Sequence, residues 1–218
     1  YYWSTLDTAQ SIVVTPSIKT TYIVTVEDAN TCSSVDTVVV DLFPLPKMNI
    51  GEDYTICIGD SVRIDNNSIG YFEWTPATTL NSDNAKKPIA KPTETTTYTL
   101  KVTDGNVCTA TDNVVVYVNP LPIVTATTLK PVICYGDTNI VTATGGKFYS
   151  WSNGYNKDSF WVKPDSTIKL DVMVTDSNKC VNYASVDVIV QQLPIIDAGK
   201  DEQVCIGNNI RSEEHTSE

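Results

Sequence analysis

One short segment occurs three times in this chain. It consists of a threonine-rich stretch of alternating apolar residues, a polar turn that contains Asp and Asn, and a cysteine. The copies are residues 96–108, 20–32 and 169–180. Self-similarity at a fixed period means that each period is one structural unit. The chain is therefore predicted to fold as a series of similar small units.

The cysteines give the length of the repeat. Successive members of one series are 76 and 72 residues apart, and successive members of a second series are 77 and 71 apart: Cys32, Cys108 and Cys180, then Cys57, Cys134 and Cys205. The tryptophans Trp3, Trp74 and Trp151 keep the same phase. A unit of about 75 residues is too long for a propeller blade or a solenoid turn, but it suits a small sandwich domain.

Proline-containing segments close each repeat, at residues 43–46, 119–122 and 192–194. Proline lacks the N–H that a sheet ladder needs and favours extended backbone, so these segments are predicted linkers. The expected organisation is a partial unit at 1–46, which holds only the C-terminal strands of a repeat, and complete units at 47–122 and 123–194. The start of a further unit follows at 195–210, and it matches residues 48–59.

Residues 211–218 match no part of the repeat. They resemble the in-frame translation of a common sequencing-adapter oligonucleotide, so we interpret them as a non-native scar and exclude them from the fold. We expect the sequence to be a fragment of a longer protein.

The chain is acidic. It carries 15 basic and 26 acidic residues, and residues 1–210 carry 14 and 23, a net charge of −9. With no basic cluster, this balance argues against nucleic acid and anionic membrane partners, and no apolar run reaches transmembrane length. His215, the only histidine, lies in the excluded segment, so the commonest general base and metal ligand is missing.

Six cysteines at repeating positions indicate an oxidising, extracytoplasmic compartment. The sequence contains no Cys-x-x-Cys pair, so zinc lacks its usual ligand set, and we expect no cofactor.

The unit 47–122 shows the clearest strand pattern. Tyr98, Leu100 and Val102 alternate with polar residues, which is typical of a half-buried strand, and the turn at 104–106 favours a hairpin. No segment has apolar residues at helical spacing over three turns. The predicted fold class is all-β, with tandem immunoglobulin-like β-sandwiches, and the Tyr at the start of the penultimate strand suits a tyrosine corner.

Several motifs recur in register. They are Cys-Ile-Gly-Asp at 57–60, Trp-Thr-Pro at 74–76, Tyr-Ser-Trp-Ser-Asn-Gly at 149–154, the thrice-repeated strand and turn, and Pro-Leu-Pro. Together they resemble the PKD-like and Ig-like repeats of very large surface proteins of gliding and other Bacteroidetes-type bacteria, over residues 1–210. The resemblance implies export by the type IX route and a role as adhesin or stalk. Leu170 departs from the pattern, since the other copies carry Tyr22 and Tyr98.

Two cysteine pairings are open. We prefer a disulfide within each unit, Cys57 with Cys108 and Cys134 with Cys180. The alternative joins sequence neighbours, as Cys32–Cys57, Cys108–Cys134 and Cys180–Cys205. The preferred pairing raises a geometric difficulty, because in an immunoglobulin-type strand order Cys57 and Cys108 lie near opposite ends of the sandwich, and cysteines whose Cα atoms are more than about 7 Å apart cannot bridge.

Two further groups are candidate sites. The turn residues Asp104, Asn106, Asp176 and Asn178 (like Asp28 and Asn30) offer oxygen ligands for calcium, although two side chains a turn fall short of a full shell, and hairpin capping explains them as well. The aromatics Tyr155, Phe160 and Trp161 are a candidate sugar-stacking surface, or else core residues.

No catalytic pair is predicted. Asp60, Asp65, Glu73 and Glu94 are scattered carboxylates, whereas a glycosidase needs two facing each other across a cleft. We therefore expect a non-enzymatic structural or adhesive array that is exported to the cell surface, with other modules of the same chain and extracellular polysaccharide as candidate partners. The alternatives are a carbohydrate-binding module at 123–194 and the accessory domains of a secreted hydrolase.

Overall fold

The computed structural model describes residues 1–197, 201, 203–209 and 215–216. The chain divides into two compact units. The first comprises Tyr1–Tyr54 and Ser61–Tyr117, and the second comprises Thr55–Asp60 and Val118–Glu218. All regular structure in the described residues is β-strand, and none of these residues forms a helix able to cross a membrane. The all-β prediction is confirmed.

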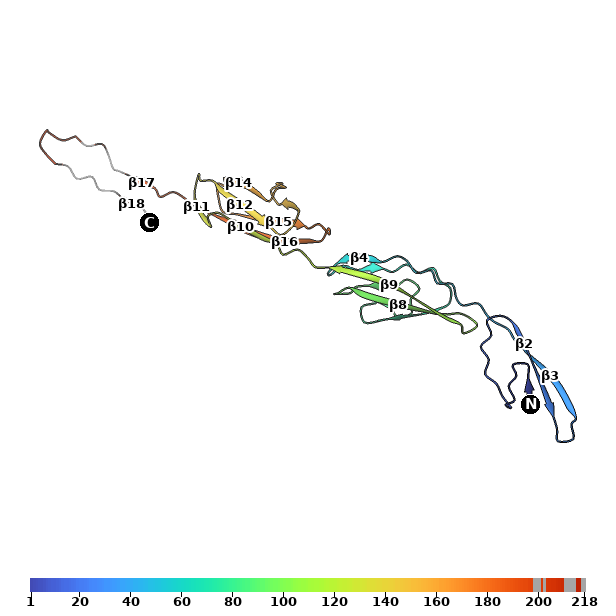
Figure 1. The fold of residues 1–218 in the computed structure, drawn as a ribbon. Helices are drawn as coiled ribbons and strands as arrows, with labels where there is room; N and C mark the ends of the chain where they lie inside the picture. Colours follow the sequence, from blue (N-terminus) through green and yellow to red (C-terminus); the bar gives the residue numbers. More distant parts are fainter. Residues whose placement is uncertain (198–200, 202, 210–214, 217–218) are drawn as a thin grey trace. The chain divides into compact units, whose positions relative to one another are not determined.

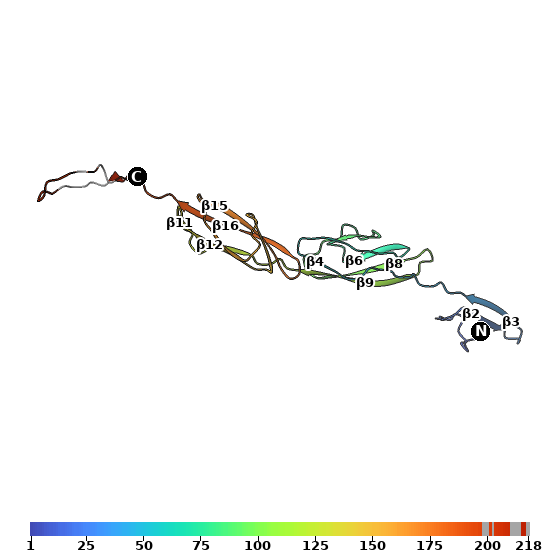
Figure 2. The ribbon, with the colours of Figure 1, turned by 90° about the horizontal axis from the view of Figure 1, so that it is seen from above.

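The second unit contains a sandwich of two sheets (Figure 1, Figure 2). One sheet has the order β10-β12-β14 and the other has the order β11-β16-β15-β13. The first is built from β10 (Thr125–Thr128), β12 (Asn139–Thr144) and β14 (Ser159–Val162), and the second from β11 (Val132–Cys134), β16 (Val181–Gln191), β15 (Ile168–Thr175) and β13 (Phe148–Trp151). All pairs are antiparallel except β11 with β16, which run parallel.

Alternating apolar side chains build the core between these two sheets. Along β15, Leu170, Val172 and Val174 are buried while Lys169 and Asp171 face solvent, as the period of two in a strand requires. Residues of both sheets form one buried cluster: Ile133, Val141, Ala143, Trp151, Phe160, Leu170, Val172, Val174 and Val188. Seven strands in two sheets around one core form an immunoglobulin-like sandwich.

The sequence repeat 47–122 forms two further sheets. Its residues lie in the first unit, apart from Thr55–Asp60 and residues 118–122, which belong to the second unit. A four-stranded sheet has the order β4-β9-β8-β6, and a two-stranded sheet pairs β5 with β7. The strands are β4 (Tyr54–Cys57), β5 (Val62–Arg63), β6 (Tyr71–Thr75), β7 (Ile89–Ala90), β8 (Thr96–Thr103) and β9 (Thr109–Asn119). As the alternation predicts, Tyr98, Leu100 and Val102 on β8 are buried. The predicted tyrosine corner is wrong, because the Tyr98 hydroxyl hydrogen-bonds the Thr79 hydroxyl.

Each repeat holds its tryptophan in the same way. The indole Nε1–H donates to a backbone carbonyl of the loop that follows the strand, at 2.9 Å in every case. The donor–acceptor pairs are Trp3 with Ala9, Trp74 with Ala85, and Trp151 with Lys157. Trp74 and Trp151 are almost fully buried, so this bond satisfies a polar group that would otherwise weaken the core.

Residues 1–46 are less densely packed. Their sheet has the order β1-β2-β3, with β1 (Tyr2–Trp3), β2 (Thr20–Glu27) and β3 (Ser33–Val40). Tyr22 is the one buried side chain in this segment, and β3 is exposed along nearly its whole length. That 1–46 is a partial repeat stays a prediction from the sequence.

The C-terminal segment is described only in part. Strand β17 (Ile196–Asp197) pairs antiparallel with β18 (His215–Thr216). Most of the predicted scar, residues 211–214 and 217–218, lies outside the described residues, as do residues 198–200, 202 and 210 of the predicted stub. The scar and the repeat boundaries remain predictions from the sequence.

Candidate functional site

A disulfide bond joins Cys57 to Cys180, whose Cα atoms lie 5.5 Å apart. Cys57 ends β4 in the sequence repeat 47–122, and Cys180 directly precedes β16 in the repeat 123–194. Both cysteines belong to the second structural unit, which includes Thr55–Asp60. The bond therefore links two successive sequence repeats covalently.

Both predicted cysteine pairings are wrong in this structure. Cys134 lies opposite Gln191 at the end of β16, whereas Cys180 lies just before the start of that strand at Val181. An eleven-residue strand separates them, and at about 3.3 Å per residue it spans roughly 36 Å. β9, also eleven residues long, separates Cys108 from the Asn119 end, where Cys57 lies. A disulfide needs Cα atoms within about 7 Å, so neither sequence repeat, 47–122 or 123–194, can be closed by a bond between its own two cysteines.

The linker after β9 places the two bonded cysteines near each other. The Ile58 N–H, directly after Cys57, donates to the Asn119 carbonyl at 2.9 Å. The Asn182 side-chain amide, two residues after Cys180, donates to the Pro122 carbonyl at 2.9 Å. One end of the segment 119–122 thus holds the Cys57 turn and the other end holds the Cys180 hairpin.

The neighbour-pairing alternative is also absent. Cys32, Cys134 and Cys205 are free and exposed, and Cys108 is free and half-buried. Cys32–Cys57, Cys108–Cys134 and Cys180–Cys205 would each use at least one of these free thiols. Sequence separation alone gave no way to choose the observed partner, because Cys57 and Cys180 are 123 residues apart.

The Asp-x-Asn turns are hairpin caps. In each turn one Asp oxygen accepts two backbone N–H groups, from the residue two positions on and from the cysteine four positions on, at 2.8–2.9 Å. The acceptors are Asp28, Asp104 and Asp176, and the donors are Asn30 and Cys32, Asn106 and Cys108, and Asn178 and Cys180. Within the described ranges, no group of three or more His, Cys, Asp or Glu residues is placed to hold a metal ion.

The left-handed residue of each hairpin is neither Gly nor Asn. It is the residue before the cysteine: Thr31 at φ 66°, Val107 at φ 65° and Lys179 at φ 68°. The Val107 N–H donates to the Asp104 carbonyl, and the Asp104 N–H donates to the Cys108 carbonyl. This is a tight turn followed by a left-handed residue, a position that favours glycine and disfavours a β-branched side chain.

The three candidate sugar-contact aromatics do not form one surface. Phe160 is 7% exposed and lies in the core, with its ring edge-on to Trp151 at a centroid distance of 5.2 Å. Tyr155 stacks on Phe160 at 4.3 Å and is half-exposed. Trp161, next to Phe160 on β14, faces the opposite way and is 63% exposed. Because neighbouring side chains of a strand point to opposite faces of the sheet, Phe160 and Trp161 cannot belong to one surface.

Trp161 lies on the outer face of the sheet β10-β12-β14, which is rich in threonine. It pairs with Ile140 on β12, and Thr142 lies two residues further along the same strand. On β10, Thr125 and Thr127 are exposed and pair with Thr144 and Thr142. An exposed indole on a threonine-rich sheet face can stack on a sugar ring, while the hydroxyls around it can donate and accept hydrogen bonds.

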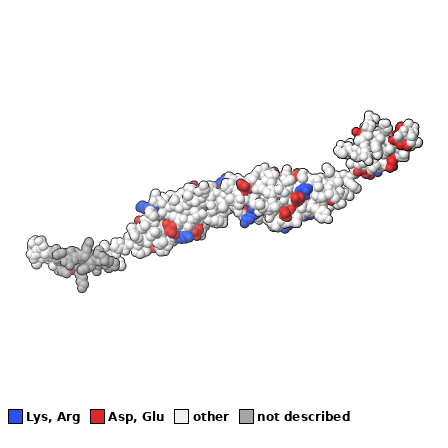
Figure 3. All heavy atoms as spheres, turned by 90° about the horizontal axis from the view of Figure 1, so that it is seen from below, with Lys and Arg blue, Asp and Glu red and all other residues white. Residues whose placement is uncertain are grey.

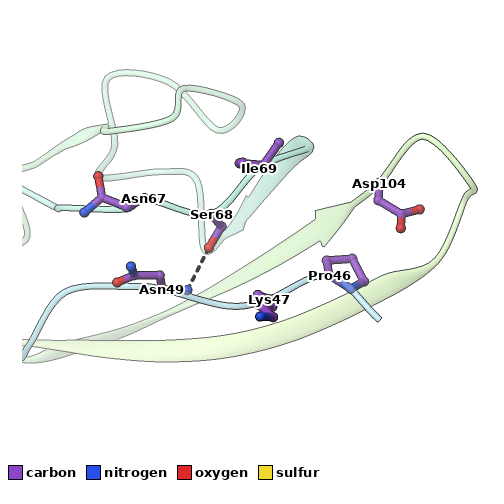
Figure 4. A pocket seen from close by; sticks show the side chains of 7 residues that line it. All are labelled: Pro46, Lys47, Asn49, Asn67, Ser68, Ile69 and Asp104. Carbon is purple, nitrogen blue, oxygen red and sulfur yellow. Dashed lines mark hydrogen bonds between the residues drawn. The ribbon is translucent and has the colours of Figure 1, made fainter. Parts of the chain in front are cut away.

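The first unit contains an open hollow of about 410 Å³ (Figure 4). Its lining residues are Pro46, Lys47, Asn49, Asn67, Ser68, Ile69 and Asp104. The polar side chains do not converge on one point, because Asp104 lies on the hairpin away from Asn67, and the Ser68 hydroxyl accepts a hydrogen bond from the Asn49 N–H at 2.9 Å. The hollow therefore presents no acid–base pair.

The scattered carboxylates lie on the surface. Asp65 pairs with Lys87 at 3.0 Å and Glu73 pairs with Lys101 at 3.1 Å, and all four side chains are at least 38% exposed. On the face drawn in Figure 3, acidic and basic side chains are dispersed over the strands, with no basic cluster. Such exposed pairs contribute little to stability and form no recognisable catalytic arrangement.

No family model matches the chain, and no curated protein matches it. Among solved structures, it is similar to the insect immune protein hemolin (16% identity, 79% of this chain and 56% of that one, TM-score 0.38). It is also similar to the N-terminal eight Ig domains of Down Syndrome Cell Adhesion Molecule, at 10% identity over 82% of this chain and 28% of that one, with a TM-score of 0.46. The match to Sidekick-1 immunoglobulin domains 1–5 has 6% identity over 80% of this chain and 45% of that one, with a TM-score of 0.34.

The chain spans about half, or less, of the length of these structures. The immunoglobulin-like assignment rests on the two sheets and the shared core of the second unit, not on these similarities.

Proposed function

We propose that this chain is a load-bearing segment of tandem immunoglobulin-like repeats in a large, exported cell-surface protein, where it acts as a stalk or adhesive array. The Cys57–Cys180 bond carries the proposal. It crosses from one sequence repeat to the next, so it fastens the repeats to each other rather than bracing a single sandwich. A protein whose task is to bind one ligand has no evident need for such a link.

Two features of the sequence and one of the structure agree with this role. Proline-containing segments separate the predicted repeats and restrict bending. The net negative charge opposes aggregation of the many strand edges. A disulfide between repeats is typical of proteins in an oxidising compartment outside the cytoplasm. The resemblance to PKD-like and Ig-like repeats of Bacteroidetes-type surface proteins belongs to this proposal.

Pulling the full chain by its two ends tests the stalk role. The disulfide closes a loop of 123 residues, which is roughly 440 Å of extended chain at about 3.6 Å per residue. In the oxidised chain the loop is expected to stay closed, so that its length is never released. In the reduced chain the same length is expected to be released as the repeats unfold under force. Equal extension of both forms at the same force would contradict a load-bearing role.

A second function, carbohydrate binding, is favoured by the exposure of Trp161 on its threonine-rich sheet face. A glycan array probed with the full chain separates the two functions. The stalk role predicts no specific, saturable binding. Saturable binding that Trp161→Ala abolishes, and that Tyr183→Ala leaves unchanged, would favour the carbohydrate-binding function. Tyr183 is the matched control because it is 67% exposed and lies in the other sheet.

A further inference from the structure

The cysteines of this chain occupy two kinds of backbone setting, each present three times. The first kind, here called the turn cysteine, comprises Cys57, Cys134 and Cys205. A glycine two residues later has positive φ in each copy, at 94° for Gly59, 89° for Gly136 and 93° for Gly207. The turn cysteine's carbonyl accepts the N–H three residues on, at 3.0, 3.0 and 3.1 Å.

The second kind, here called the hairpin cysteine, comprises Cys32, Cys108 and Cys180. Each follows a left-handed residue, and each N–H donates to an Asp oxygen four residues earlier at 2.9 Å. Within each kind, therefore, the three cysteines share the same turn hydrogen bond and the same positive-φ neighbour.

The observed disulfide joins one cysteine of each kind. It runs from the turn cysteine of one repeat, Cys57, to the hairpin cysteine of the next, Cys180. The contact that seats the Cys57 turn recurs one repeat later, since the Tyr135 N–H donates to the Gln191 carbonyl at 2.8 Å, as the Ile58 N–H donates to the Asn119 carbonyl at 2.9 Å. Cys134 is thus presented at the end of its sandwich in the way that Cys57 is presented beside Asn119.

We propose that Cys134 is an attachment site for the hairpin cysteine of a following copy of the repeat, and that Cys108 is the attachment site for the turn cysteine of a preceding copy. One disulfide then crosses each junction of the array. The inference deepens the proposed stalk function and rests on it for the presence of neighbouring copies. It also explains why four cysteines have no partner among the described residues, although they occupy the same settings as the bonded pair.

The chemistry is ordinary thiol–disulfide exchange. Each new bond forms between two thiol sulfurs, which together lose two protons and two electrons. A small-molecule disulfide such as glutathione disulfide accepts them and becomes two thiols. The exposed Cys134 is accessible to such an oxidant.

Successive loops would interlock. The Cys57–Cys180 loop contains Cys134, so a loop that begins at Cys134 starts inside the first and ends beyond it. Each residue between the outermost bonds then lies within at least one closed loop. Unfolding of one sandwich under load would then release little length. Bonds inside separate repeats would release more, because the residues between those bonds lie in no closed loop.

A full chain with one inserted repeat tests the proposal. A second copy of residues 123–194 is placed after Pro194, and this copy carries Tyr135→Phe and Tyr183→Phe as mass tags next to its two cysteines. Both tyrosines are exposed, so the tags leave the core unchanged. The chain is oxidised with glutathione disulfide, free thiols are alkylated, and disulfide-linked peptides are identified by mass spectrometry.

The expected result is two linked peptide pairs. Cys57 is joined to the untagged Cys180, and Cys134 is joined to the hairpin cysteine of the tagged copy. Cys134→Ser in the same chain should free the tagged hairpin cysteine and leave the Cys57–Cys180 link intact. Alkylated Cys134, a Cys134–Cys108 link, or loss of both expected links would overturn the proposal. Correct links in a chain that fails the pulling test would contradict the stalk function alone.

Discussion

Cys57, in the sequence repeat 47–122, and Cys180, in the sequence repeat 123–194, are covalently joined although 123 residues separate them. The chain-entropy model assigns a loop of this length about 5 kcal/mol of stabilisation as an upper figure. We expect Cys57→Ser to lower the stability of the second unit by up to that amount. The measurement is urea unfolding followed by tryptophan fluorescence, in a chain whose other tryptophans (Trp3, Trp74 and Trp161) are replaced by Phe so that Trp151 is the probe. Cys134→Ser, at the equivalent position but unbonded, should change stability by less than about 0.5 kcal/mol. Equal losses in the two variants would contradict the assigned pairing.

Val107 offers a stabilising substitution. Its φ of 65° is unfavourable for a β-branched residue, and its side chain is 80% exposed, so little packing is lost on its removal. Val107→Gly should raise stability by about 1 kcal/mol, which is visible as a higher melting temperature in calorimetry. Val107→Ala keeps a Cβ at the same backbone angle and should gain less. A lower melting temperature for Val107→Gly would show that the left-handed conformation is wrongly assigned.

Asp104 tests capping against calcium binding. Asp104→Ala leaves the Asn106 and Cys108 N–H groups without their acceptor and should cost about 1–2 kcal/mol. Asp104→Asn keeps a side-chain oxygen and should cost less. Both losses should be the same in excess Ca²⁺ and in EDTA, because the Asp oxygen serves the backbone. If Ca²⁺ raises the melting temperature of the unmodified chain, and Asp104→Asn abolishes that rise, the turn is a calcium site.

The Asp41 carboxyl makes the stability of the fold depend on pH, because its pKa is lowered in the folded chain. The hydrogen bond from Lys19, at 2.7 Å, and then the Leu42 backbone N–H hold the pKa of the Asp41 carboxyl below its ordinary value. A lowered folded-state pKa stabilises the fold above the unfolded-state pKa, and this stabilisation is lost as pH falls through the folded-state pKa. Lys19→Met should raise the pKa of Asp41, as followed by NMR titration of the carboxyl carbon. Lys87→Met, which removes the partner of Asp65, should leave the Asp41 titration unchanged.

The strands were predictable because their determinants are local. The alternation of Tyr98, Leu100 and Val102 identifies a half-buried strand without any knowledge of its neighbours, and the buried face of β8 has these residues. The phase of Trp74 and Trp151 likewise indicated the core positions, since both indoles are buried. The hydrogen bonds from their Nε1–H groups could not be predicted, because every residue has a backbone carbonyl and the residue type does not show which one accepts.

The disulfide was not predictable from the repeat alone. Which thiols form a bond depends on the length of β16 and on where the linker 119–122 places the following hairpin. The spacing of the cysteines determines neither of these. The length of the strands that follow the hairpins does exclude a bond inside each repeat. The eleven-residue β16 separates Cys134 from Cys180 by far more than a disulfide can span.

The hairpin at 104–106 was predictable, but the position of its left-handed residue was not. Gly105 and Asn106 are the residues that most readily adopt positive φ, and yet Val107 does so. The Asp104 cap and the two backbone hydrogen bonds of the turn fix which position is left-handed, whatever residue occupies it. Here the hydrogen-bond pattern of the turn outweighs the preference of its residues.

Non-reducing peptide mapping of the full chain tests the central claim most directly. Free thiols are alkylated before digestion with trypsin and Asp-N, which places each of the six cysteines in a separate peptide. We expect one major linked pair, the peptide containing Cys57 joined to the peptide containing Cys180, with Cys108 and Cys134 alkylated. Peptides that link Cys57 to Cys108 and Cys134 to Cys180 would contradict it, because each repeat would then be closed on itself and the array would have no covalent link between repeats.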